Sequence, residues 1–211
     1  MIILFGSQKG GTGKSTLSAS TAAYLAGKGK DVILVDADPQ GTTASWAEAR
    51  EELSLPRVNF VEKSGSLKKS LLDLKERYEC IVVDCAGKDS KELRTALLVA
   101  DVCFIPCQPS QADLDTLEAV SEIIETAKDL NEELKIYTLL NRVPTNPKNK
   151  ETIESMEFIR EYYADLNPID QTMRDLKVHR NALRAGKGVT EYKNEKGAWD
   201  LINIMESTIN V

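Results

Sequence analysis

A chain of 211 residues, of which 42% are hydrophobic and 28% charged, has the composition of a globular protein with one full core, so we expect a single domain over 1–211. Its apolar runs, about five to seven residues long, are too short for a transmembrane helix, and no signal peptide precedes the first predicted strand, so we expect a cytoplasmic protein without a membrane partner. The net charge of −6 excludes a surface that is basic throughout, but not a local basic patch.

The first predicted elements are a strand, a glycine-rich loop and a helix. Apolar residues 1–5 lead into the loop QKGGTGKST at 8–16, and small residues with helical spacing follow at 17–28. Glycines let the backbone of such a loop wrap its N–H groups around a phosphate, and the helix adds the positive end of its dipole. Lys14 would contact the β- and γ-phosphates, and the Ser15 hydroxyl would bind Mg²⁺. The loop residues expected to contact a nucleotide are Lys9, Gly10, Gly11, Thr12, Gly13, Lys14, Ser15 and Thr16.

This loop is a variant of the usual phosphate-binding motif. The pattern G-x-x-x-x-G-K-[ST] requires a glycine where this chain has Gln8. The variant K-G-G-x-G-K-[ST] is met instead, with a second lysine, Lys9, at its front. Lys9 is either part of the site or a solvated loop lysine.

Two aspartates follow the second predicted strand, 31–36, whose continuous apolar run indicates a central strand of a parallel sheet. Residues two apart on an extended chain point the same way, so Asp36 and Asp38 can face one site at the carboxyl end of this strand. Two carboxylates suit a magnesium shell and the positioning of a water molecule. The alternative is an ordinary turn rich in Asp, Pro and Gly.

A third aspartate ends another buried strand. A helix at 42–53, a strand at the sheet edge at 57–62 and an amphipathic helix at 67–78 precede the apolar run that ends in Asp84. An apolar run ending in aspartate downstream of a phosphate loop is a Walker B pattern. Asp84 would bind Mg²⁺ through water, and the N–H of Gly87 would meet the γ-phosphate and sense its presence.

The alternation of strands and helices continues to the end of the chain. We expect a helix at 91–100, a strand at 101–107 that has stopped pairing by Pro106, a long helix at 109–130, a strand at 134–141, a helix at 151–166, a short strand at 168–173 and a closing helix at 199–209. This order predicts a three-layer α/β fold of the P-loop NTPase type, with a mainly parallel central sheet flanked by helices. Four cysteines without CxxC spacing are expected to be buried thiols: Cys80, Cys85, Cys103 and Cys107.

The positive charge of the chain is concentrated near its C-terminus. Residues 174–196 contain seven basic and three acidic residues, so the rest of the chain is strongly acidic. This segment is either a site for a polyanion or a solvated basic helix end.

Taken together, these motifs resemble the deviant Walker A ATPases, and the chain is similar over nearly its whole length to the ParA-type partition and positioning ATPases, in a short form that lacks an N-terminal helix-turn-helix. The resemblance implies an ATP- and Mg²⁺-dependent homodimer in which Lys9 reaches the partner subunit's nucleotide and the segment 109–115 lies near the interface. It gives Lys9, Lys14 and Asp38 catalytic roles, with Asp38 orienting the attacking water, and assigns Ser15, Asp36 and Asp84 to the metal. It also assigns Asn141 and Arg142 to adenine, because an Asn side chain can pair with the N6 and N7 edge; the alternative for Asn141 is an ordinary turn residue.

The same resemblance implies that the ATP dimer binds double-stranded DNA of any sequence and therefore associates with the nucleoid. The DNA-binding candidates are Arg174, Lys177, Arg180, Arg184 and Lys187. Hydrolysis would be slow alone and stimulated by a partner adaptor or centromere-binding protein, in a cycle that partitions a plasmid or positions another cargo. Two departures from the family pattern are Leu176, where relatives often have arginine, and Cys85-Ala86 after the Walker B aspartate.

Four alternatives share the predicted fold. A membrane-bound division ATPase of the MinD type would need a basic amphipathic C-terminal helix, which the tail ESTINV does not provide. A nitrogenase-reductase-like electron carrier would need cluster-binding cysteines, which Cys85 and Cys103 match poorly. A metabolic P-loop enzyme, such as a carboxylation-type synthetase, and an ATPase that assists relaxosomes in conjugation both remain open.

Overall fold

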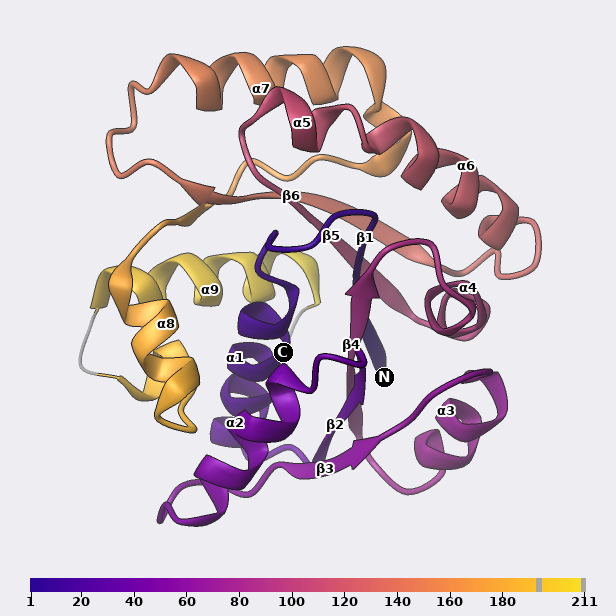
Figure 1. The fold of residues 1–211 in the computed structure, drawn as a ribbon, viewed down its shortest axis with the longest axis vertical. Helices are drawn as coiled ribbons and strands as arrows, with labels where there is room; N and C mark the ends of the chain where they lie inside the picture. The colour runs from indigo at the N-terminus through magenta and orange to yellow at the C-terminus, as the bar shows by residue number, and fades with distance from the viewer. Residues whose placement is uncertain (193–194, 210–211) are drawn as a thin grey trace.

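The computed structural model of the chain describes residues 1–192 and 195–209, and this part contains one seven-stranded parallel sheet (Figure 1). The strand order is β3-β2-β4-β1-β5-β6-β7. The strands are β1 (Ile2–Ser7), β2 (Val32–Ala37), β3 (Asn59–Glu62), β4 (Cys80–Gly87), β5 (Val102–Cys107), β6 (Lys135–Val143) and β7 (Met173–Arg174). The predicted fold class, with β3 at the sheet edge, is confirmed.

Helices cover both faces of the sheet (Figure 1). One layer consists of α1 (Lys14–Gly27), α2 (Thr42–Glu51), α8 (Lys177–Arg184) and α9 (Glu195–Thr208). The other consists of α3 (Lys68–Lys75), α4 (Lys91–Leu97), α5 (Gln111–Leu114), α6 (Leu117–Lys128) and α7 (Lys150–Tyr162). Two short 3₁₀ turns, η1 (Ala164–Leu166) and η2 (Val189–Glu191), complete the described elements. Among the described helices, none is long and apolar enough to cross a membrane.

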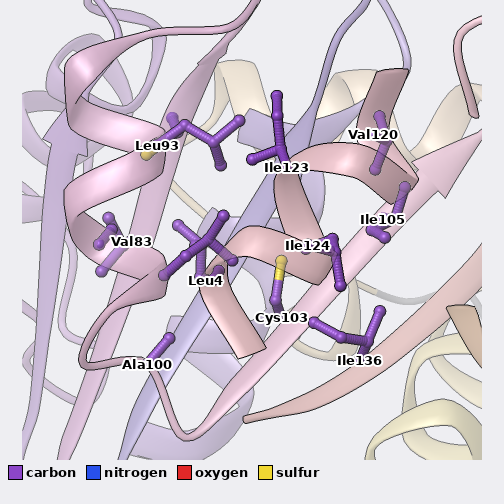
Figure 2. Close-up of a cluster of buried hydrophobic side chains, with 14 of the residues drawn as sticks. Leu4, Val83, Leu93, Ala100, Cys103, Ile105, Val120, Ile123, Ile124 and Ile136 are labelled. Atoms are coloured by element: carbon purple, nitrogen blue, oxygen red, sulfur yellow. The ribbon is translucent and has the colours of Figure 1, made fainter. Parts of the chain in front are cut away.

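The central strands are mainly apolar because each is buried on both faces, and their polar residues lie toward their carboxyl ends. Ile2 and Leu4 of β1 belong to the core beneath the α3–α7 layer, whereas Ile3 and Phe5 belong to the core beneath α1, α2, α8 and α9. Figure 2 shows the first core, in which Leu4 lies among side chains from α4 and α6. The four cysteines are free thiols and are buried, as predicted.

Three predicted elements differ in the structure. The helix expected over 109–130 begins at Gln111 and is divided into α5 and α6, with Asp115 and Thr116 between them. The strand expected over 168–173 is reduced to an isolated bridge at Pro168 and the two-residue β7.

The third correction concerns Pro106, which remains paired within β5. Pairing of β5 with β1 ends at Phe104, while pairing with β6 continues through Cys107. A residue without an N–H is therefore tolerated where only one neighbouring strand remains.

Candidate nucleotide-binding site

The glycine-rich loop connects the end of β1 to the first turn of α1. Gly11 and Gly13 adopt φ angles of 80° and 94°, a region that favours glycine, whereas Gly10 does not. A Cβ on Gly13 would also lie 2.3 Å from Nδ2 of Asn141. The geometry of this loop therefore depends on glycine at two of the three expected positions.

A cavity of about 580 Å³ opens above the loop at the carboxyl ends of the strands. It is lined by the loop, Asp38 and Gly87, by Asn141 and Arg142, which contact the loop, and by residues of β7 and α8. A nucleotide with its phosphates on the loop would extend along this lining. The predicted site residues that line the cavity are Gly10, Gly11, Gly13, Lys14, Ser15, Thr16, Asp38, Gly87, Asn141, Arg142, Arg174 and Arg180.

Four residues predicted to contact the nucleotide or the metal lie outside the cavity lining: Lys9, Thr12, Asp36 and Asp84. Thr12 is buried beneath the loop, where its hydroxyl lies 3.2 Å from that of Ser7. It therefore contributes to loop structure in this conformation.

The Lys14 side chain is held under the loop. Its ammonium donates to the Ser7 hydroxyl and to the Lys9 carbonyl, both at 3.0 Å. Burial lowers the pKa of Lys14, while the negative charges of Asp84 and Asp38 raise it. A cation supported by two acceptors and by carboxylates is suited to bind a phosphate that replaces these acceptors.

Asp36 and Asp84 are neighbours because β2 and β4 pair in register at these residues. Asp36 accepts from the backbone N–H groups of Asp38 and Ala44, both at 3.0 Å, so its two oxygens fix the loop that carries Asp38 and the start of α2. Asp38 itself is half-buried, lines the cavity and accepts from the N–H of Gln40 at 2.9 Å.

Asp84 is fully buried, and one of its carboxylate oxygens has no hydrogen-bond partner among the described residues. Burial raises the pKa of Asp84 to about 7, against a hydrogen bond from Ser15 that lowers it. An orphaned carboxylate oxygen beside the Ser15 hydroxyl fits Mg²⁺, which prefers oxygen ligands. The described residues contain no cluster of three or more His, Cys, Asp or Glu that could hold a metal alone, so this ion would complete its shell with water and phosphate oxygens.

Three side chains brace the loop from the ends of β5 and β6. Asn141 Nδ2 donates to the Thr12 carbonyl at 2.5 Å. Arg142 Nη1 and Gln108 Nε2 both donate to the Gly11 carbonyl, at 3.1 and 3.3 Å. The amide nitrogen of Asn141 thus donates to the loop. Its side-chain oxygen could accept a hydrogen bond from a nucleotide base. Sequence reasoning missed Gln108, because a polar residue after a strand carries no signal of the loop that it contacts.

Lys9 forms an ion pair within its own subunit, with Asp113 of α5. Asp113 is buried, and its other oxygen accepts from the N–H of Gln108 at 2.8 Å. The segment 109–115, expected near a dimer interface, therefore supplies a residue that contacts the loop directly. Asp113 was not among the predicted site residues.

The five DNA-binding candidates have different surroundings. Arg174 makes a bidentate pair with Asp200, at 2.8 and 2.7 Å, and also donates to the Lys196 carbonyl. Arg180 pairs with Asp175 at 2.8 Å. Within residues 1–192 and 195–209, no acidic partner pairs with the remaining three: Lys177, Arg184 and Lys187. Of the basic segment defined above, residues 193 and 194 lie outside the described residues, as do the last two residues of the tail, 210 and 211.

Comparison with known proteins finds relatives similar in sequence and solved structures similar in fold. The chain is 30% identical to the maintenance of carboxysome distribution protein A of Halothiobacillus neapolitanus over 184 residues, covering 86% of this chain and 82% of that protein. Its fold is similar to that of a substituted Cyanothece McdA in complex with ATP (TM-score 0.83, 16% identity, 98% and 95% of the two chains). It is also similar to the septum site-determining protein MinD of Pyrococcus horikoshii complexed with Mg-ADP (TM-score 0.71, 19% identity, 99% and 95%).

The match to a protein-family model covers most of the chain and identifies its family. Residues 3–186 match the CobQ/CobB/MinD/ParA nucleotide binding domain, a range that includes the phosphate loop, both aspartate-ended strands and α8. The family expected from the loop sequence is confirmed. The chain belongs to the CobQ/CobB/MinD/ParA family of nucleotide-binding domains.

Proposed function

We propose that this protein is an ATP-dependent dimerising switch that binds DNA in its ATP state and positions a cargo. The observation that carries this proposal is the cavity lined by the phosphate loop, Asp38, Gly87 and Asn141. Its size suits one nucleoside triphosphate. The relatives complexed with ATP and with Mg-ADP support nucleotide binding with magnesium.

Each loop residue then has a defined chemical task. Lys14 binds the β- and γ-phosphates, and the N–H of Gly87 contacts the γ-phosphate. Mg²⁺, when bound through Ser15 and Asp84, would neutralise charge that develops on the phosphates. Asp38 orients a water toward the γ-phosphorus. The bond from that phosphorus to the β–γ bridging oxygen breaks, and ADP and phosphate form.

Dimerisation completes the site in this proposal. Lys9 leaves Asp113 and contacts the nucleotide of the partner subunit, so two subunits close face to face around two ATP molecules. The closed dimer doubles a basic surface on and after α8. Lys177 and Arg184 of α8 and Lys187 after it contribute charges that have no acidic partner among the described residues, and Arg174 and Arg180 lie nearby. Roughly four to eight phosphate contacts would give weak, strongly salt-dependent binding to DNA of any sequence.

Hydrolysis would be slow without a partner and stimulated by an adaptor protein. It would reopen the dimer and release the DNA. The protein would act in the cytoplasm and associate with the nucleoid in its ATP state. The relative named for carboxysome distribution favours positioning of a large cargo, and a plasmid is the other candidate. A metabolic ATP-dependent enzyme or a relaxosome-assisting ATPase would share the same site, but the first of these would have no use for the unpaired basic residues of α8.

The deciding experiment measures binding of the purified protein to a random-sequence duplex at about 0.1 M salt in apo, ADP and ATP–Mg²⁺ states. We expect binding only with ATP–Mg²⁺, and loss of both ATP and DNA binding in Lys14→Ala. Lys28→Ala, at the far end of the same helix, is the matched control. If the protein binds ATP but binds no DNA in any nucleotide state, the proposed DNA-binding cycle is refuted and a metabolic ATP-dependent enzyme is favoured.

A further inference from the structure

A buried arginine joins the helix after the Asp38 loop to the basic segment. Arg50 of α2 is buried, and its guanidinium makes a bidentate pair with Glu191 of η2, at 2.8 and 2.7 Å. It also donates to the Gly186 carbonyl at 3.0 Å and to the Pro56 carbonyl at 2.7 Å. Charge-assisted bidentate bonds fix both distance and orientation.

The contact between α2 and this segment extends beyond the ion pair. Trp46, which is also buried, stacks under the Arg50 guanidinium and donates from Nε1 to the Lys187 carbonyl at 3.1 Å. Gly186 has φ 66°, and a Cβ there would lie 2.5 Å from the backbone nitrogen of Arg50. The backbone of the segment 186–191 is therefore packed closely against α2.

The segment 186–191 contacts both helices that begin at the loops of the nucleotide site, α1 and α2. α2 begins directly after the Asp38 loop and is fixed there by the bond from the Ala44 N–H to Asp36. α1 begins in the phosphate loop, and its Ser20 hydroxyl accepts from the Val189 N–H at 3.3 Å. Gly188 packs so closely on α1 that a Cβ would lie 2.5 Å from Cβ of Ala23.

Two basic residues that lack an acidic partner among the described residues lie in this segment or next to it. Arg184 ends α8, and Lys187 lies between the two glycines that contact α2 and α1. A shift of α2 relative to α1 would therefore change the backbone that carries these charges.

We propose that the Arg50–Glu191 pair, supported by Trp46, is a positioning pair that transmits the state of the Asp38 loop to the DNA-binding segment, so that its geometry sets the difference in DNA affinity between the ATP and ADP forms. This proposal rests on the proposed function. It assigns the coupling to a contact that touches neither nucleotide nor DNA.

The test variants must separate coupling from folding. Removing one partner leaves a buried charge unpaired and destabilises a protein, whereas replacing both partners by apolar residues of similar size is often tolerated. Glu191→Gln keeps the acceptor oxygen and shape, and the double variant Arg50→Met/Glu191→Leu keeps the packing. Asp170→Asn removes one charge from the exposed Arg160–Asp170 pair and is the matched control.

The measured quantity is the ratio of DNA affinities with ATP–Mg²⁺ and with ADP, recorded together with ATP affinity, dimerisation and thermal unfolding. We expect this ratio to fall by about 5- to 50-fold in the double variant and less in Glu191→Gln, with ATP affinity unchanged, and to stay at the wild-type value in Asp170→Asn. An unchanged ratio in the double variant would overturn the proposal. Loss of ATP binding together with DNA binding in both test variants would do the same, because it would assign the pair to folding alone. If the wild-type protein binds DNA with the same affinity in ATP–Mg²⁺ and in ADP, the proposed function itself is refuted.

Discussion

The ammonium of Lys9 and the carboxylate of Asp113 are paired within one subunit, although Lys9 is the residue expected to cross to the partner's nucleotide. Because Asp113 is buried, withdrawing Lys9 leaves its carboxylate with the Gln108 N–H as its one remaining hydrogen-bond donor among the described residues. The pair therefore favours the separate subunit over the closed dimer.

The first prediction concerns Asp113→Asn, which weakens the hold on Lys9 but keeps an acceptor for the Gln108 N–H. We expect ATP-dependent dimerisation to become tighter by about fivefold, which corresponds to about 1 kcal/mol for a partly exposed pair. Sedimentation or light scattering over a range of concentrations measures this. Asp115→Asn, on the exposed side of the same segment, is the control, and a dimer no tighter than wild type would contradict the role of Asp113.

The second prediction concerns Asp38→Ala. The variant loses the residue that we propose to orient the attacking water but keeps Lys14 and the loop, so it should bind ATP normally and accumulate a long-lived ATP dimer. We expect hydrolysis to fall at least about 100-fold, the lower range for loss of a positioned acid or base group. Phosphate release and dimer lifetime are the measurements, with Asp31→Ala at the other end of β2 as control. Full activity in Asp38→Ala would remove Asp38 from the mechanism.

The third prediction uses His179, the sole histidine of the chain. Burial lowers the pKa of His179, although the neighbouring charges of Asp200 and Asp175 raise it and that of Arg174 lowers it. The folded protein thus binds fewer protons than the unfolded chain just below the usual pKa of histidine, so stability is lost as the pH falls below about 6.5. We expect the melting temperature to decrease less from pH 7.5 to pH 5.5 in His179→Gln than in wild type; parallel profiles would contradict this.

The fourth prediction separates the basic residues by their partners. Arg184→Ala/Lys187→Ala should weaken DNA binding in the ATP state and reduce the slope of log affinity against log salt by roughly 1 per lost contact, without lowering the melting temperature. Arg174→Ala should instead lower the melting temperature, because Asp200 loses a bidentate partner. Salt titrations and thermal unfolding distinguish the two. A normal salt slope in the double variant would move the DNA surface elsewhere.

Local sequence was sufficient for the phosphate loop and for the strands that end in Asp36 and Asp84, because glycine conformation and apolar runs are properties of short segments. It was insufficient for Gln108 and Arg50, whose partners are Gly11 and Glu191. These contacts join residues 97 and 141 positions apart, so only the packed fold brings them together. The same holds for Pro106, whose place in β5 depends on where β1 ends.

The two cores described above give the molecule two independent sides. The helices that begin at the phosphate loop and the Asp38 loop and the helix that carries unpaired basic residues share one of them, so coupling between the proposed nucleotide and DNA sites would not have to cross the sheet. The α3–α7 side contributes Asp113 to the loop, which gives that side its own route to Lys9. DNA and an adaptor bound on opposite sides would therefore act on the same nucleotide without competing for surface.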